Sequence, residues 1–178
     1  MRVIGGRLKN LRLNPPANLP VRPTTDLAKE ALFNILYNQY DFGSLKVLDL
    51  FSGTGNISVE FASRGVPEIV AVDRHQGCAH YLKSIAKQYE LNTIKVHKAD
   101  VFKYLELENV QYDLIFADPP YDLPQIPEIA VQVFNNGLLK PGGVLIIEHP
   151  SMKKIDHPNF TAQRKYGSSS FSFFEQPE

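Results

Sequence analysis

The most informative segment of this sequence for its fold is Val47-Leu48-Asp49-Leu50-Phe51-Ser52-Gly53-Thr54-Gly55. Its apolar beginning is typical of a buried strand, and a helical pattern over Ile57–Ser63 follows the glycines. Glycine lets the backbone turn tightly, so that the free amide hydrogens at the start of the helix face a ligand. A lone Gly-x-Gly is weak evidence, but its place between a strand and a helix predicts a ligand-binding turn.

Buried strands and amphipathic helices alternate on both sides of this stretch. We predict strands over Leu45–Phe51, Glu68–Val72, Thr93–His97, Tyr112–Ala117 and Val144–Glu148, and helices over Asp26–Tyr40, Ile57–Ser63, Gln76–Glu90 and Pro127–Asn135. Continuous apolar strands separated by helices predict a parallel α/β sheet that is covered on both faces.

Turn residues set the expected limits of these elements. Thr24 or Thr25 is suited to cap the first helix, and Gly43 is expected to end it. A Pro-Gly-Gly turn at 141–143 precedes the fifth strand. The tail has room for two more strands, Phe160–Tyr166 and Ser169–Phe174, joined by a tight turn at Gly167. The last part of the chain is therefore predicted to add a hairpin to the sheet.

The composition indicates an ordinary soluble domain. The chain has 178 residues, 43% of them hydrophobic and 21% charged, which suits one domain over 1–178. The single cysteine, Cys78, excludes an internal disulfide framework and is typical of a reducing compartment. No segment resembles a signal peptide or approaches the roughly 18 apolar residues of a membrane span. We therefore expect a cytoplasmic protein with no membrane partner.

The net charge of zero hides a basic N-terminal arm over 1–23. This arm contains no acidic residue, and its five basic residues are Arg2, Arg7, Lys9, Arg12 and Arg22. The remainder has 14 basic residues, which is 19 minus 5, against 19 acidic ones. Charge alone favours a solvated, flexible N-terminus. The alternative is a segment that contacts nucleic-acid phosphates, because clustered Arg and Lys release counterions there.

Acidic residues after successive strands point to an adenosine-containing cofactor. Asp73 ends the second strand 20 residues after Gly53, which suits a carboxylate that accepts hydrogen bonds from ribose hydroxyls. Ser58 replaces the third glycine of the dinucleotide fingerprint, and Asp49 could meet a cationic cofactor end. These two details favour S-adenosylmethionine (SAM) over NAD. Asp100 could reach the adenine amino group, with Val101 or Phe102 against the ring, or it could merely cap the next helix.

The fourth strand runs into Asp118-Pro119-Pro120-Tyr121. Ligands of an open α/β sheet bind beyond the carboxyl ends of its strands, so this loop should face the cofactor. Two prolines supply carbonyls but no amide hydrogens, and the loop therefore offers acceptors only. Asp118 and the Pro119 carbonyl could each accept one N–H of an exocyclic amine, while Tyr121 stacks on the base. A structural proline-rich turn is the alternative interpretation.

Together these motifs resemble a known family. The Asp49–Gly55 turn and the Asp118–Tyr121 tetrad resemble those of amino-methyltransferases that act on nucleic-acid bases. The segments Arg2-Val3-Ile4-Gly5-Gly6, Arg22-Pro23-Thr24-Thr25-Asp26 and Glu30-Ala31-Leu32-Phe33-Asn34-Ile35-Leu36 are similar to those of the RsmD family of bacterial 16S rRNA guanine-N2 methyltransferases. The resemblance runs over nearly the whole chain, although Asn10-Leu11 and Leu27 stand where the family usually has more positive charge.

The resemblance implies a Rossmann-like class I SAM-dependent methyltransferase fold. This is an α/β fold with a seven-stranded, mostly parallel sheet, a terminal antiparallel strand and helices on both faces. It also implies SAM as methyl donor and 16S rRNA in the assembled or assembling small ribosomal subunit as partner. We expect the protein to be a monomer. The expected cofactor-binding residues are Asp49, Phe51, Ser52, Gly53, Thr54, Gly55, Asp73, Arg74, Asp100 and Val101. The expected catalytic residues are Asp118, Pro119, Pro120 and Tyr121, and the five basic residues of the arm are expected to bind RNA.

Other functions remain as alternatives at this point. The tetrad is shared with DNA adenine-N6 and cytosine-N4 methyltransferases, but the chain has no separate target-recognition domain. A non-catalytic RNA- or SAM-binding module would not need both Asp118 and Tyr121. His75, Cys78 and His80 lie close in sequence, yet on a helix their side chains point in different directions. We therefore expect no metal site.

Overall fold

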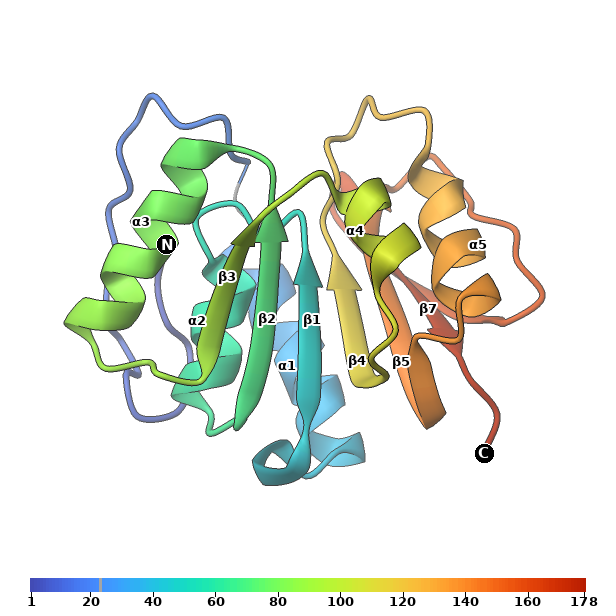
Figure 1. Cartoon of the computed structure of the whole chain (residues 1–178), viewed down its shortest axis with the longest axis horizontal. Helices are drawn as coiled ribbons and strands as arrows, with labels where there is room; N and C mark the ends of the chain where they lie inside the picture. The colour runs from blue at the N-terminus through green and yellow to red at the C-terminus, as the bar shows by residue number, and fades with distance from the viewer. Residues whose placement is uncertain (23) are drawn as a thin grey trace.

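The computed structural model describes residues 1–22 and 24–178, so that Pro23, the last residue of the predicted basic arm, lies outside the described residues. The described residues form seven strands and five α-helices in the alternating order predicted (Figure 1). The strands are β1 Lys46–Leu50, β2 Glu68–Asp73, β3 Ile94–Lys98, β4 Tyr112–Ala117, β5 Leu139–Pro150, β6 Phe160–Tyr166 and β7 Ser169–Glu175. The helices are α1 Asp26–Gln39, α2 Asn56–Ser63, α3 Gln76–Gln88, α4 Val101–Leu107 and α5 Ile126–Asn135, with a 3₁₀ turn over Phe42–Ser44.

The strands make one sheet in the order β3-β2-β1-β4-β5-β7-β6. The neighbours from β3 to β5 are parallel, and β7 pairs antiparallel with both β5 and β6. The predicted sheet with a chain-terminal antiparallel strand is therefore confirmed. The chain leaves β1 towards β2 on one side and later returns to β4 on the other. This reversal makes the carboxyl ends of β1 and β4 the switch point at which ligands of open α/β sheets bind.

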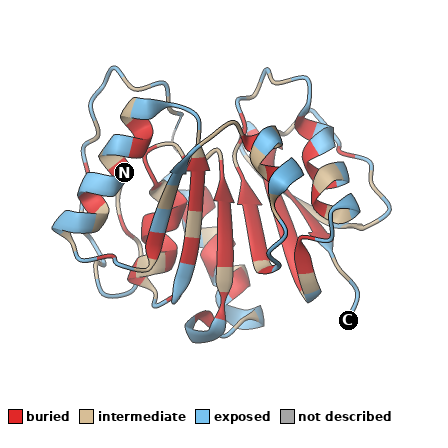
Figure 2. Ribbon diagram, viewed as in Figure 1, coloured by how far each residue is buried: buried red, intermediate tan, exposed pale blue. Residues whose placement is uncertain are grey.

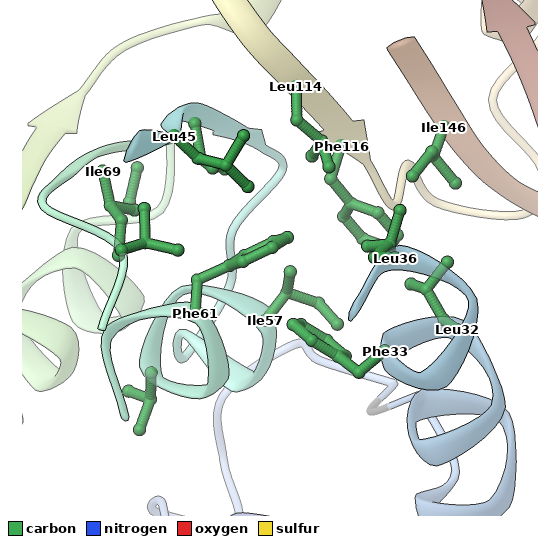
Figure 3. Packing of buried hydrophobic residues seen from close by; sticks show 14 of the residues in the cluster. Leu32, Phe33, Leu36, Leu45, Ile57, Phe61, Ile69, Leu114, Phe116 and Ile146 are labelled. Carbon is green, nitrogen blue, oxygen red and sulfur yellow. The ribbon is translucent and has the colours of Figure 1, made fainter. Parts of the chain in front are cut away.

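Two hydrophobic cores cover the two faces of the sheet (Figure 2). Side chains alternate along a strand, so Val47 of β1 packs towards α1, α2 and α3 while Leu48 packs towards α4 and α5. Figure 3 shows the first core, in which Leu32, Phe33 and Leu36 of α1 lie with Phe61 of α2 and Phe116 of β4. Asp49 faces this side as well, and it is held there by α2.

Several limits differ by one or two residues from those expected, and three features differ more. Thr25 caps α1, but the helix ends at Gln39 where Tyr40 becomes extended, and Gly43 belongs to the separate 3₁₀ turn. The residues 141–143 lie inside β5 at an irregularity in the pairing with β4, where Gly142 adopts φ 79°. The sequence indicates helix α4 only as the element that Asp100 would cap. Its seven residues are too few for a clear helical period.

The N-terminal segment is not a flexible tail, which corrects the interpretation that charge alone favours. Met1 and Leu13 pair through their backbones, and an isolated bridge joins Arg2 to Arg12. The amides of Ile4 and Gly5 each donate to the carboxylate of Glu60 at 2.9 Å. Backbone hydrogen bonds therefore fix the start of the chain against α2.

A buried ion pair completes this attachment. Lys29 of α1 and Glu60 of α2 are both fully buried, with Nζ 3.2 Å from Oε1. Lys29 also donates to the Arg2 carbonyl and to Asn56 Oδ1. Removing one partner of such a pair costs about 3–5 kcal/mol, since it leaves a buried charge unmatched. The N-terminal segment is thus part of the fold. None of the helices in the described residues is both long and apolar enough to cross a membrane.

Candidate active site

A cleft of about 720 Å³ lies at the carboxyl ends of the parallel strands. This volume is within the usual range for small-molecule sites. Most of the predicted site residues line it, namely Asp49, Phe51, Ser52, Gly53, Thr54, Asp73, Arg74, Asp100, Val101, Asp118, Pro119, Pro120, Tyr121 and Arg22. Gly55 does not line the cleft, and neither do Arg2, Arg7, Lys9 or Arg12.

The turn after β1 is tightly constrained. Gly53 and Gly55 both have positive φ, and a Cβ on Gly55 would lie 2.3 Å from a methyl group of Leu82. Gly55 is therefore needed for packing and for the left-handed start of α2. Phe51 adopts φ 55°, which costs a bulky residue about 1–2 kcal/mol. Strain of this kind persists where the surrounding structure enforces it, and it clusters at ligand sites.

Asp49 is buried beneath this turn, and Ser58 holds it in place. The Ser58 hydroxyl donates to Asp49 Oδ2 at 2.6 Å, and both residues are almost completely buried. The serine at the third position of the glycine fingerprint therefore has a positive role. Burial raises the pKa of Asp49 to about 7, and the hydrogen bond from Ser58 offsets only part of that effect.

Asp73 connects the turn to the next strand. It accepts a hydrogen bond from the Gly53 amide at 2.9 Å and another from the His75 amide at 2.8 Å. Asp100 accepts from the Lys103 amide at 3.1 Å and thus caps α4, and it also lines the cleft. Phe102 lines the cleft and meets Phe51 edge to face, with centroids 6.2 Å apart. The two rings form an apolar wall beside two carboxylates.

The loop after β4 lies directly beside the turn after β1. Asp49 and Leu50 of β1 are paired in register with Phe116 and Ala117 of β4, and the Asp118 amide donates to the Leu50 carbonyl. Asp118 is thereby fixed at the edge that carries the glycine turn. Burial and the nearby Glu148 carboxylate raise the pKa of Asp118 well above its usual range, and Arg22 counteracts them.

Arg22 closes over this loop. Its Nη2 donates to Asp118 Oδ1 at 3.1 Å, and its guanidinium carbon lies 3.7 Å from the centre of the Tyr121 ring. Such stacking is a cation–π contact. Arg22 is expected to contact RNA as part of the arm, and the structure places it in the lining of the cleft, whereas the other four basic residues of the arm do not line it.

Glu148 is the functional candidate that the sequence interpretation missed. It lies in β5 beside β4 and is completely buried. Thr24 donates to its Oε2 at 2.6 Å, whereas Oε1 has no hydrogen-bond partner among the described residues and lies 3.7 Å from Arg22 Nη1. The sequence feature that could have identified Glu148 is an acidic residue directly after the apolar run 144–147. The adjacent His149 is buried, with its Nε2 2.7 Å from the Ser172 hydroxyl oxygen.

The histidines and the cysteine near the cleft do not form a metal site. His75 caps α3 by accepting from the Cys78 amide, and Cys78 is buried. Within residues 1–22 and 24–178, no group of three or more His, Cys, Asp or Glu side chains could hold a metal ion. The side chains that line the cleft are mainly carboxylates, aromatic rings and the guanidinium groups of Arg22 and Arg74.

Comparisons with known proteins agree with this geometry. The chain is 29% identical over 161 residues to the Ribosomal RNA small subunit methyltransferase D of Buchnera aphidicola, covering 89% of this chain and 82% of that protein. Its fold is similar to that of the yhhF protein of Escherichia coli, with a TM-score of 0.88 at 22% identity over 99% of this chain and 98% of that one.

A third comparison concerns a structure with bound ligands. The Thermus thermophilus 16S rRNA N2 G1207 methyltransferase, solved with AdoMet and guanosine, matches with a TM-score of 0.72 at 22% identity over 89% of this chain and 45% of that one. This likeness shows a shared fold. A family model described as Conserved hypothetical protein 95 matches residues 1–175. The resemblance found in the sequence is thereby confirmed, and the chain belongs to the Conserved hypothetical protein 95 family, the RsmD family of methyltransferases.

Proposed function

We propose that this chain transfers the methyl group of SAM to the exocyclic N2 amine of a guanosine in 16S rRNA of the small ribosomal subunit. The proposal takes 1–178 as one catalytic domain that acts as a monomer in the cytoplasm. One observation carries it: the acceptor-only loop Asp118–Tyr121 lies beside the glycine turn that ends β1. A methyl donor on that turn and an amine at that loop would be neighbours.

The cofactor would lie along the carboxyl edge of β1, β2 and β3. Asp73 would accept hydrogen bonds from the ribose hydroxyls, since its carboxylate lines the cleft and can accept more than the two amide hydrogens it already holds. Val101 and Phe102 would pack against the adenine. Asp49 would face the cationic methionine end. AdoMet and guanosine, the two ligands bound in the Thermus structure, support this assignment for a protein with the same fold.

The amine would be held at Asp118. Its carboxylate and the Pro119 carbonyl would each accept one N–H, and Tyr121 would stack on the base. The nitrogen of an exocyclic amine is a poor nucleophile because its lone pair is delocalised into the base, so orientation towards the methyl group matters most. In the reaction a C–N bond forms, the C–S bond breaks, and its electron pair stays on sulfur. The proton that N2 loses passes to Asp118 directly or through water.

The N-terminal segment would contribute the RNA contacts. Arg7, Lys9 and Arg12 are exposed, while Arg2 is half-buried and pairs with Asp26 at 3.1 Å. Thr54 of the glycine turn also contacts the Met1 sulfur at 3.8 Å, so the basic residues are carried on a segment fixed to the site. The name of the Buchnera relative, a small-subunit rRNA methyltransferase, supports RNA as the substrate.

Transfer from labelled SAM tests the proposed reaction. The protein is incubated separately with unmethylated small subunits, naked rRNA and duplex DNA, and the labelled nucleoside is identified. We expect N2-methylguanosine from rRNA or subunits. Asp118→Ala should lower the rate by about a hundredfold or more while SAM binding survives. Asp122→Ala, on the exposed part of the same loop, is the matched control and should retain activity. Label found only in N6-methyladenine or N4-methylcytosine of DNA would refute the proposal.

The pKa of Asp49 predicts a pH-dependent affinity for SAM. The unliganded protein holds a proton on Asp49 up to a pH of about 7, whereas a bound cation favours the carboxylate. Binding must therefore release this proton at lower pH, and affinity should rise by up to about tenfold per pH unit below pH ~7 and then level off. Calorimetry in buffers of different ionisation enthalpy measures both the affinity at each pH and the number of protons released on binding. Asp49→Asn should weaken binding and abolish the proton release; a pH-independent affinity of the unchanged protein contradicts this role.

The salt dependence of RNA binding tests the N-terminal segment. Lys9 and Arg12 are exposed, so replacing both by Gln should leave the fold intact. If they contact phosphates, the slope of log affinity against log salt should become shallower by about 1.4, which is ~0.7 for each contact to single-stranded RNA. Lys46→Gln with Lys140→Gln removes the same charge from the amino ends of β1 and β5 and should leave the slope unchanged. If the two double variants have equal slopes of log affinity against log salt, Lys9 and Arg12 do not contact the phosphates.

A further inference from the structure

A second carboxylate, Glu148, lies close to the proposed amine site, buried beside Arg22 and outside the lining of the cleft. Asp118 begins the loop after β4, and Glu148 lies in the neighbouring strand β5. Burying a carboxylate without partners is unfavourable, and yet Glu148 Oε1 is fully buried and receives no hydrogen bond from any described residue. Thr24 holds the other oxygen, Oε2, so the carboxylate is oriented, and Oε1 faces the Arg22 guanidinium at 3.7 Å, beyond hydrogen-bond distance. Such an arrangement is expected where a bound ligand supplies the missing hydrogen-bond donor.

Arg22 shows what kind of group the two carboxylates and Tyr121 accommodate. Its flat guanidinium stacks 3.7 Å above the Tyr121 ring, donates to Asp118 Oδ1 at 3.1 Å, and points Nη1 towards Glu148 Oε1 at 3.7 Å. Guanine contains the same unit, because N1–H, C2 and the 2-amino group form a planar guanidine with adjacent donors. The Arg22 side chain is 47% exposed, so its withdrawal costs little burial.

We propose that Glu148 accepts the N1–H of the target guanine while Asp118 accepts an N–H of its 2-amino group, in the place that Arg22 occupies without substrate. This inference rests on the proposed function and deepens it, since it assigns the choice of base to one residue. Glu148 is a specificity-determining residue in this account. The transferred methyl group never touches it.

The same contact would reject the other bases that carry exocyclic amines. In adenine the atom next to the amine-bearing carbon is N1, and in cytosine it is N3. Both atoms present a lone pair where guanine presents a hydrogen. A lone pair facing a buried carboxylate oxygen loses a charge-assisted hydrogen bond and adds repulsion. Glu148 would therefore separate guanine-N2 methylation from the adenine and cytosine reactions that share the Asp-Pro-Pro-Tyr tetrad.

Nucleoside binding tests this inference without any methyl transfer. Guanosine and 2-aminopurine riboside both carry the 2-amino group, but only guanosine has N1–H. Dissociation constants are measured by NMR titration of the protein saturated with S-adenosylhomocysteine. We expect the unchanged protein to prefer guanosine by about tenfold to a hundredfold, the usual value of one hydrogen bond to a charged group. In Glu148→Gln the amide oxygen can accept from Thr24 and its NH₂ can face the site, so the preference should fall to parity or reverse.

Two further variants separate this role from a structural one. Arg22→Ala removes the stacked guanidinium but keeps both carboxylates, and it should retain the preference for guanosine. Glu106→Gln makes the same exchange on the exposed face of α4 and should change nothing. A structural defect in Glu148→Gln would weaken both nucleosides equally and leave their ratio unchanged. The inference is overturned if Glu148→Gln has the same ratio of the two dissociation constants as the unchanged protein. It is also overturned if the unchanged protein binds both nucleosides equally or binds neither. Labelled product on a base other than guanine overturns the proposed function instead.

Discussion

The register between β1 and β4 is the constraint on which the rest of the site depends. Because Leu50 pairs with Ala117, the glycine turn and the Asp118 loop start at the same level of the sheet. A slip of this register by one residue would move the Asp118 loop away from the glycine turn, so that methyl donor and amine would no longer be neighbours. It would also turn Asp49 to the other face of the sheet. The register is enforced by the two cores, which require alternate residues of both strands on opposite faces. Burial of apolar side chains therefore sets the geometry for the chemistry.

The buried charges of the molecule are matched by segments from distant parts of the sequence. Glu60 is matched by Lys29, Arg64 and two backbone amides, Asp49 by Ser58, and Glu148 by Thr24. Much of this matching comes from the first thirty residues, which wrap α2 and then reach the cleft at Thr24. The N-terminal segment thus has two roles in our account. It compensates buried carboxylates, and it carries the basic side chains proposed to meet RNA.

Much of the fold followed from the sequence because local patterns and global topology agree. Strands such as Tyr112–Ala117 are short apolar runs with clear turn residues, and the sheet direction followed from the helices between them. The cofactor and amine motifs could also be recognised from the sequence, since each lies within a few residues of one strand end. Glu148 could not, because Thr24 and Asp118 lie 124 and 30 positions away in the sequence and only the tertiary fold brings them close to it. The N-terminal segment was misjudged for a related reason. Charge composition cannot predict the hydrogen bonds that the amides of Ile4 and Gly5 donate to Glu60.

We propose that one edge of the sheet presents a guanine amine to a methyl donor. A crystal structure of this protein with S-adenosylhomocysteine and guanosine measures it most directly. We predict a base stacked on Tyr121 with Arg22 displaced, its 2-amino nitrogen within hydrogen-bond distance of Asp118 and the Pro119 carbonyl, and its N1 facing Glu148. The 2-amino nitrogen should also point at the cofactor sulfur. A guanosine bound with its N7 edge towards Asp118, or outside the cleft with Arg22 still on Tyr121, would contradict the account.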